Sequence, residues 1–287
     1  MRDFQVLFEH GEHAELLDPV YASYGRLGFP APPGGRPWIY ANFVQSLDGI
    51  VSLLGPDASG GDIAQSPEDR WLMDLLRAHA DAVLMGIRTL IQETALGRPR
   101  PRGPVFRIVE PTLQQLRQKL HLGLERNIFV TASTKLRLDD YAVFDGDKVE
   151  PMILTTEEGA SALQPQLESH PKVRVMAAGR GTLVDLPLAM QRLREEFGIR
   201  RLLCEGGPTL YANLLREGLI DEKFLTISPV DAGQAMPAEQ TSEGASNLRP
   251  TILPGPGFTK DHLVHWQWLS CRKIGDYQFN RYRLQRT

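Results

Sequence analysis

The chain has few cysteines, no long hydrophobic run and no excess of positive charge. Cys204 and Cys271 are the only cysteines in 287 residues. They are too few for a disulfide framework or a zinc knuckle, and they favour a reducing, cytoplasmic setting. No stretch approaches the roughly 18 apolar residues of a membrane span, and the charged N-terminus is unlike a signal peptide. The formal net charge of −3 provides no basic field for nucleic acid. We therefore expect neither a membrane nor nucleic acid as a partner.

The composition is that of a globular protein, since 42 % of the residues are hydrophobic and 23 % are charged. Short apolar stretches alternate with helical segments, which is typical of an α/β fold with a largely parallel sheet. The last two stretches, 261–274 and 277–284, are joined by a Gly275-Asp276 turn and predict antiparallel edge strands. The sequence thus predicts a single mixed, mostly parallel sheet that is flanked by helices.

The first 36 residues differ in composition from the rest of the chain. Proline and glycine concentrate between residues 30 and 37, which is typical of a linker. We expect residues 1–36 to be a loosely packed N-terminal extension with a short helix near 14–24. Residues 37–287 are expected to form the domain.

The predicted fold is organised around the stretch 199–215. It begins as an apolar strand, breaks at Gly206 and Gly207, and continues with the spacing of a helix. A strand that runs through glycines into a helix presents bare N–H groups and the positive end of the helix dipole, which together bind anions. A plain strand–helix turn with glycines for tight packing is the alternative. The pattern recurs where the apolar stretch 82–85 ends at Gly86.

A helix start is predicted at Ser66, where Ser66 can cap the helix and Pro67 suits its first turn. Glu68 and Asp69 complement the helix dipole. Asp69 is therefore either a helix-start charge or a functional carboxylate, and the residues alone leave both open.

Several stretches occur together in a fixed order. They are Ala41-Asn42 with Ser46-Leu47-Asp48-Gly49, Leu76-Arg77-Ala78 with 80–86 and Thr89, Val184-Asp185-Leu186, and Glu205-Gly206-Gly207-Pro208-Thr209-Leu210. This combination resembles the reductase domain of riboflavin biosynthesis, the C-terminal half of the bifunctional pyrimidine deaminase–reductase. That domain belongs to the dihydrofolate reductase-like superfamily, and the resemblance covers roughly residues 37–287.

The resemblance implies NADPH as the hydride donor and assigns its contacts. Gly86 and Thr89 would hold one part of the pyrophosphate, and Gly206, Gly207 and Thr209 the other. The adenosine 2′-phosphate would face Thr131 and Ser133, with Lys135 or Arg137 beside them. The residues implied on the nicotinamide side are Ala41, Asn42, Ser46, Asp48 and Gly49.

The resemblance also implies substrate contacts. Arg77 matches the family arginine that meets the ribose phosphate, and Glu205 would lie next to the substrate. Asp69 is placed like the pterin-binding carboxylate of dihydrofolate reductases, and Glu93 stands where the family has Asp. The candidate catalytic acids are therefore Asp69, Glu205 and Glu93. The substrate loop departs from the family because 62–65 lacks the usual Trp.

These observations predict an NADPH-dependent reductase of a pyrimidine or pterin-like heterocycle, with no metal. The activity it most resembles is 5-amino-6-(5-phosphoribosylamino)uracil reductase. The zinc-binding deaminase signature is absent from this sequence. Alternatives are a dihydrofolate or pterin reductase, a reductase of an unrelated carbonyl or imine, and an NADP-binding protein that has lost catalysis. The resemblance and the aromatic strand near Trp266 and Trp268 predict a homodimer.

Overall fold

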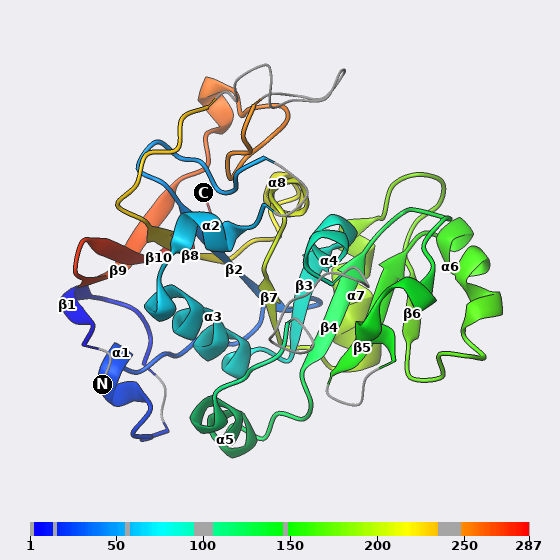
Figure 1. The fold of residues 1–287 in the computed structure, drawn as a ribbon, viewed down its shortest axis with the longest axis horizontal. Coiled ribbons are helices and arrows are strands. Elements are labelled where there is room, and N and C mark those ends of the chain that lie inside the picture. The colour runs from blue at the N-terminus through cyan, green and yellow to red at the C-terminus, as the bar shows by residue number, and fades with distance from the viewer. Residues whose placement is uncertain are drawn as a thin grey trace.

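The fold is seen in a computed structural model that describes residues 3–13, 16–54, 58–94, 106–145, 149–234 and 248–286, with only the backbone of 92–94. A ten-stranded sheet crosses the molecule in the order β1-β9-β10-β8-β2-β7-β3-β4-β5-β6 (Figure 1). Its parallel strands are β2 (Trp38–Gln45), β3 (Ala82–Gly86), β4 (Arg126–Val130), β5 (Glu150–Thr155), β6 (Arg174–Ala177), β7 (Arg201–Cys204) and β8 (Glu222–Ile227). Its antiparallel strands are β1 (Gln5–Glu9), β9 (Trp266–Ile274) and β10 (Tyr277–Leu284).

The predicted single mixed sheet with antiparallel C-terminal strands is confirmed. Its outermost antiparallel strand is β1, because the N-terminal segment pairs with β9. Strand β9 begins at Trp266 and not at residue 261 as predicted, since 260–262 forms a short 3₁₀ turn.

Helices cover both faces of the sheet and divide the core into two clusters. One face packs against α3 (Pro67–His79) and α5 (Pro111–Lys119), with Leu75 and Leu113 fully buried. The other face packs against α7 (Leu186–Phe197) and α8 (Pro208–Arg216), with Leu193 and Leu214 buried. The other helices are α1 (Tyr21–Tyr24), α2 (Gly60–Ala64), α4 (Ile87–Thr94) and α6 (Glu157–Leu163). Within the described residues, no helix has the length and apolar character needed to cross a membrane.

The start of α3 follows the sequence prediction. The Oγ atom of Ser66 accepts a hydrogen bond from the backbone N–H of Asp69 at 3.1 Å, and Pro67 is the first helical residue. Such a cap satisfies one of the unpaired N–H groups of the first turn. Asp69, in this first turn, lies beside Thr226 near the end of β8.

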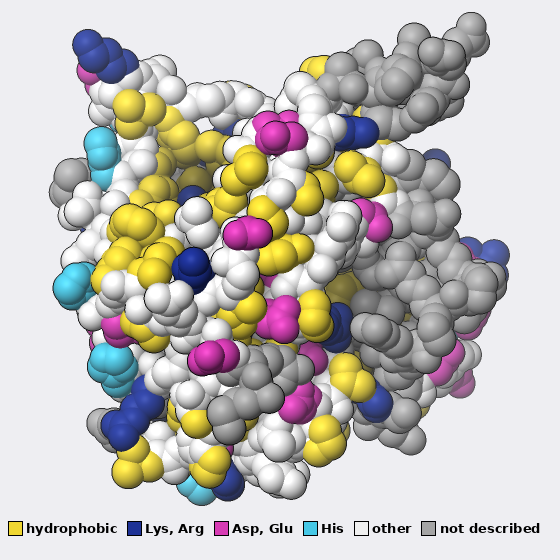
Figure 2. Space-filling view, turned by 60° about the vertical axis from the view of Figure 1, so that its left-hand side comes forward, with side chains coloured by type: hydrophobic (Ala, Val, Ile, Leu, Met, Phe, Trp, Pro, Cys, Tyr) yellow, Lys and Arg dark blue, Asp and Glu magenta, His cyan; other side chains and the backbone are white. Residues whose placement is uncertain are grey.

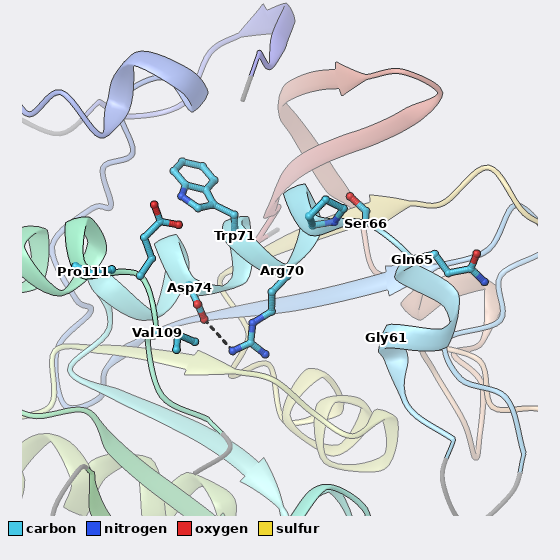
Figure 3. A pocket seen from close by; sticks show the side chains of 10 residues that line it. Gly61, Gln65, Ser66, Arg70, Trp71, Asp74, Val109 and Pro111 are labelled. Carbon is cyan, nitrogen blue, oxygen red and sulfur yellow. Dashed lines mark ion pairs between the residues drawn. The ribbon is translucent and has the colours of Figure 1, made fainter. Parts of the chain in front are cut away.

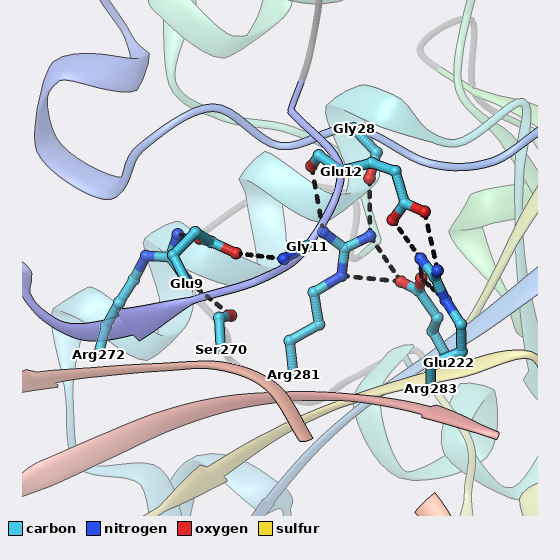
Figure 4. A network of polar contacts seen from close by, with 9 residues as sticks. All are labelled: Glu9, Gly11, Glu12, Gly28, Glu222, Ser270, Arg272, Arg281 and Arg283. Carbon is cyan, nitrogen blue, oxygen red and sulfur yellow. Dashed lines mark hydrogen bonds and ion pairs between the residues drawn. The ribbon is translucent and has the colours of Figure 1, made fainter. Parts of the chain in front are cut away.

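The described residues 3–13 and 16–36 are not the loosely packed extension that their composition predicts. Tyr24 and Leu27 are each only 1 % exposed and belong to the main core. Arg281 of β10 donates hydrogen bonds to the Gly28 carbonyl at 2.6 Å and to the buried Glu222 carboxylate at 2.8 Å, and Arg283 pairs with Glu12 (Figure 4). Burial of an arginine–carboxylate cluster under this segment fastens it to β10. The domain boundary at residue 36 stays a prediction.

Candidate active site

Two glycine turns meet at the carboxyl ends of adjacent parallel strands. The backbone N–H of Gly86, at the end of β3, donates a hydrogen bond to the carbonyl oxygen of Gly206 at 2.7 Å. The residue before that turn, Glu205, donates its N–H to the Leu84 carbonyl at 3.0 Å. The peptide bond between Gly206 and Gly207 is cis. Because β7 and β3 are neighbours and parallel, the structure brings both predicted turns into one place.

The N-terminus of α8 fits a pyrophosphate. Gly207 is its N-cap, no side chain caps it, and its first turn holds no acidic residue, so no capping side chain competes with an anion for its first N–H groups. A Cβ added to Gly207 would lie 3.8 Å from the Thr89 hydroxyl oxygen, which places Thr89 beside the turn. Thr209 is exposed in the first turn of α8. Bare backbone at this point would let an anion approach closely.

The end of β4 supplies the predicted 2′-phosphate turn. The Thr131 hydroxyl oxygen accepts the N–H of Ser133 at 3.0 Å, and the Ser133 hydroxyl oxygen accepts the N–H of Lys135 at 3.1 Å. The side chains of Ser133, Lys135 and Arg137 are exposed, whereas Thr131 is buried. This turn lies on the same sheet edge as the glycine turns because β4 pairs with β3 in parallel.

The turn at residues 46–49 joins a neighbouring loop. The Asp48 carboxylate accepts the N–H groups of Ala232 at 3.1 Å and Gly233 at 2.7 Å. The Ser46 hydroxyl donates to it as well, and these bonds lower the pKa of Asp48 below its ordinary value, the bond from Ser46 first. Gly49 has a positive φ of 86°, which a glycine adopts without strain. Asp48 thus holds two loops together, and its predicted contact with the nicotinamide side stays a prediction.

On β2, Ala41 is fully buried and packs with the α7–α8 core cluster. The adjacent Asn42 carries a buried side-chain oxygen with no hydrogen-bond partner in the described structure. A buried acceptor without a donor is costly, so Asn42 is suited to receive an N–H group from a bound molecule.

A cleft of about 750 Å³ opens beside α3, between α2 and the segment before α5. Its α3 side includes Arg70, Trp71 and Asp74, and Val109 lies next to Asp74 (Figure 3). Arg70 forms an ion pair with Asp74 at 3.4 Å and remains 39 % exposed. A volume of this size suits a small-molecule ligand, and Arg70 gives the cleft a cation.

Asp69 lies next to Arg70 in the chain and is directed toward the sheet. Burial raises the pKa of its carboxyl to about 6, although the Thr226 hydroxyl of β8 and the nearby Arg70 oppose the shift. Thr226 itself is 1 % exposed. A carboxyl whose pKa lies near neutrality can both hold and release a proton at working pH.

Arg77 and Glu205 form a buried ion pair. The Nε and Nη2 atoms of Arg77 donate to the two carboxylate oxygens of Glu205, each at 2.6 Å. Nη1 donates to Asp74 at 3.2 Å. Burial alone would lower the pKa of Arg77, but Glu205 and Asp74 outweigh it and raise that pKa. The structure therefore places two predicted site residues in contact with each other.

The third candidate acid, Glu93, has a side chain outside the described part of the structure. Sequence reasoning missed Arg70, Asp74 and Thr226. The sequence could have indicated Arg70 and Asp74, because positions 70, 74 and 77 lie on one face of a helix and Arg77 is already a candidate. For Thr226 there was no such indication, since only strand pairing brings β8 next to α3's first turn.

Comparison with known proteins agrees with this architecture. The model of the family described as RibD C-terminal domain matches residues 37–276. A 2,5-diamino-6-ribosylamino-4(3H)-pyrimidinone 5′-phosphate reductase of Archaeoglobus fulgidus is 28 % identical over 227 residues, covering 78 % of this chain and 90 % of the relative. The reductase of the same name from Methanothermobacter thermautotrophicus is also 28 % identical, and the match covers 80 % of this chain and 98 % of that relative. The crystal structure of a pyrimidine reductase-like protein from Corynebacterium diphtheriae superposes with a TM-score of 0.66 at 21 % identity, over 88 % of this chain and 93 % of that one.

Proposed function

Because this chain belongs to the RibD C-terminal domain family, we propose that it is an NADPH-dependent reductase of a ribosylaminopyrimidine 5′-phosphate. The observation that carries the proposal is the pair of glycine turns joined by the Gly86–Gly206 hydrogen bond. A cleft that Arg70 lines lies on the other side of α3's Asp74, which is bonded to Arg77. The archaeal relatives are named for the 2,5-diamino form of such a substrate.

NADPH would supply the hydride. The N–H groups at the start of α8 and the Gly86 turn would bind its pyrophosphate, as helix N-termini do. Lys135 and Arg137 would bind a 2′-phosphate through charge-assisted contacts. The unpartnered Asn42 oxygen would accept an amide N–H on the nicotinamide side. Hydride transfer needs such positioning and water exclusion more than covalent help from the protein.

The substrate would place its phosphate at Arg70 in the cleft beside α3, and its ring would reach past the first turn of α3 to Asp69, which lies beside Thr226 of the sheet. Reduction adds a hydride to carbon and leaves charge on a heteroatom, so a proton must be supplied. Asp69 suits this role because burial raises its pKa to about 6. Glu205 is less suited, since both of its oxygens already accept N–H groups from Arg77.

Dihydrofolate is the second candidate substrate. A carboxylate in the position of Asp69 could pair with the amino-pyrimidine edge of a pterin through two parallel hydrogen bonds. The cation at Arg70 favours a phosphorylated substrate over a pterin. An NADPH-binding protein without turnover is the remaining alternative.

We propose further that two copies associate through the end of the sheet that carries β1 and β9. Hydrophobic side chains gather on the surface that this end brings forward in Figure 2. Val6 is 50 % exposed and Trp268 is 47 % exposed. Light scattering at micromolar concentration should give the mass of a dimer, and a monomer mass would contradict the proposal.

The two buried free cysteines suit the reducing cytoplasm that we propose as the location of the protein.

The test of function is oxidation of NADPH, followed by absorbance, with a panel of substrates. We expect turnover with 2,5-diamino-6-ribosylamino-4(3H)-pyrimidinone 5′-phosphate and less with the corresponding aminouracil. Turnover of dihydrofolate alone would move the assignment to the pterin alternative. NADPH binding without turnover of any member would favour the inactive binding protein.

A further inference from the structure

Arg137, at the end of the turn that follows β4, is an exposed residue between two buried ones. Leu136 is 7 % exposed and Leu138 is fully buried, whereas the Arg137 side chain is exposed. The backbone of Arg137 is extended, with a φ of −111° and a ψ of 123°. Successive side chains of an extended backbone point to opposite sides, so the burial of the two leucines directs the Arg137 side chain outward.

Gln166 bonds the backbone on both sides of Arg137. Its Nε2 atom donates to the carbonyl oxygen of Leu136 at 3.0 Å, and its Oε1 atom accepts the N–H of Leu138 at 2.8 Å. Gln166 comes from a different part of the chain, the 3₁₀ turn η3 (Gln164–Gln166). Its amide therefore uses one donor and one acceptor on the two peptide groups that flank the Arg137 Cα atom. These two bonds restrain the φ and ψ of Arg137, and with them the direction in which its side chain leaves the backbone.

The same loop holds the residues after Arg137 through His170. The His170 side chain is only 6 % exposed. Its Nε2 atom lies 3.0 Å from a carboxylate oxygen of Asp139, and its Nδ1 atom lies 3.2 Å from a carboxylate oxygen of Asp145. Residues 164–170 thus contact the segment 136–145 at its beginning and at its end.

We propose that Gln166 is a positioning residue for dinucleotide selectivity: by fixing the two peptide groups around Arg137, it holds the guanidinium where it binds the 2′-phosphate of NADPH. The inference rests on the proposed function, because it needs this phosphate at the turn after β4. A backbone that is already fixed reduces the conformational entropy that Arg137 loses when it binds the phosphate. NADH lacks the 2′-phosphate, so its binding should not depend on Gln166.

The test is Gln166→Met, which keeps the length of the side chain and removes both hydrogen bonds. We expect the NADPH dissociation constant, measured by fluorescence titration, to rise about fivefold, roughly the effect of one neutral hydrogen bond, with the NADH constant within about twofold of wild type. Gln164→Met is the matched control, because Gln164 is exposed in the same turn, and it should bind both dinucleotides as wild type does. If Gln166→Met does not fold, Gln166→Asn keeps the amide but is one methylene too short to reach both peptide groups, and the same selective loss is expected.

Arg137→Ala decides whether Gln166 acts through Arg137. This variant alone should weaken NADPH binding, and adding Gln166→Met to it should cause no further loss, because the two residues then act as one unit. Three results would each overturn the inference: wild-type NADPH affinity in Gln166→Met, an equal loss of NADPH and NADH binding in it, or its full effect in the Arg137→Ala background. Equal affinities of the wild type for the two dinucleotides would refute the assignment of this turn in the proposed function, and the inference with it, before any variant is made.

Discussion

The backbone N–H of Gly86 and the carbonyl oxygen of Gly206 are 2.7 Å apart, although 120 positions separate these residues in the sequence. The bond joins the ends of β3 and β7. It brings the two strand–glycine–helix turns together into a single site. Its main consequence is that variants at either turn should act on the same ligand.

Gly207→Ala should weaken NADPH binding and leave the protein folded. A Cβ at Gly207 meets only the Thr89 hydroxyl at 3.8 Å, an ordinary contact, and the φ of Gly207 is −63°. The added methyl group would instead occupy the space of a phosphate at the start of α8. We expect the dissociation constant to rise at least about tenfold, measured by titration, with little change in Tm.

Gly123→Ala is the matched control for this variant, because a Cβ at Gly123 meets nothing within 4 Å. Gly206 is a poorer probe: its φ is +85° and a Cβ there would lie 3.1 Å from the Phe43 ring, so substitution would disturb the fold as well. Wild-type titration behaviour in Gly207→Ala would show that the pyrophosphate lies elsewhere.

The protein should prefer NADPH to NADH at least about tenfold, because hydrogen bonds to charged groups contribute about 1.5–3 kcal/mol each. The exposed Lys135 and Arg137 follow β4 at the sheet edge of the glycine turns. Their combined replacement by Ala should remove much of the preference in kcat/KM, whereas Lys273→Ala, an exposed lysine of β9, should not. Equal use of both dinucleotides by the wild type would contradict the assignment of this turn.

Asp69→Asn should lower kcat roughly a hundredfold, the low end of what a positioned acid supplies, with NADPH affinity preserved. Burial raises the pKa of Asp69 to about 6, so a protonated donor is lost as pH rises through that value. The wild-type kcat/KM should fall above a pH of about 6, and the variant should lose this limb. A pH profile that is unchanged in the variant would rule out Asp69 as the donor.

The same pKa has a consequence for stability. The folded-state pKa of Asp69 lies above its ordinary value of 3.8, so the folded protein favours the protonated form. Its contribution to stability is complete below a pH of about 4 and is lost as pH rises toward 6. Asp69→Asn should therefore unfold with a weaker pH dependence in this window, measured by urea denaturation.

Removal of residues 1–36 should destabilise the domain severely. The deletion would uncover Arg281 and Glu222, which are 2 % and 0 % exposed, and would remove the core residues Tyr24 and Leu27. Loss of two such side chains alone costs about 3 kcal/mol or more. Urea denaturation of the truncated chain measures the effect, and a truncated protein as stable as the full chain would show that this segment is dispensable.

The sequence by itself determined the α/β class, the antiparallel C-terminal pair, both glycine turns and the start of α3. These features have local signals: alternating apolar stretches, glycines placed between a strand and a helix, and Ser66-Pro67 at a helix start. Backbone geometry over a few residues decides them, so a short window of sequence contains the information.

The tertiary structure decided which residues contact one another. Arg77 and Glu205 are separate candidates in the sequence, but β7 brings Glu205, 128 residues away, into contact with Arg77. Asp48 binds the backbone of a loop 184 residues further along, and the proline-rich N-terminal segment is fastened by Arg281 and Arg283 of β10. Such partners depend on strand order and on the desolvation of charged side chains once the sheet has assembled, and neither is encoded in any local stretch of the chain.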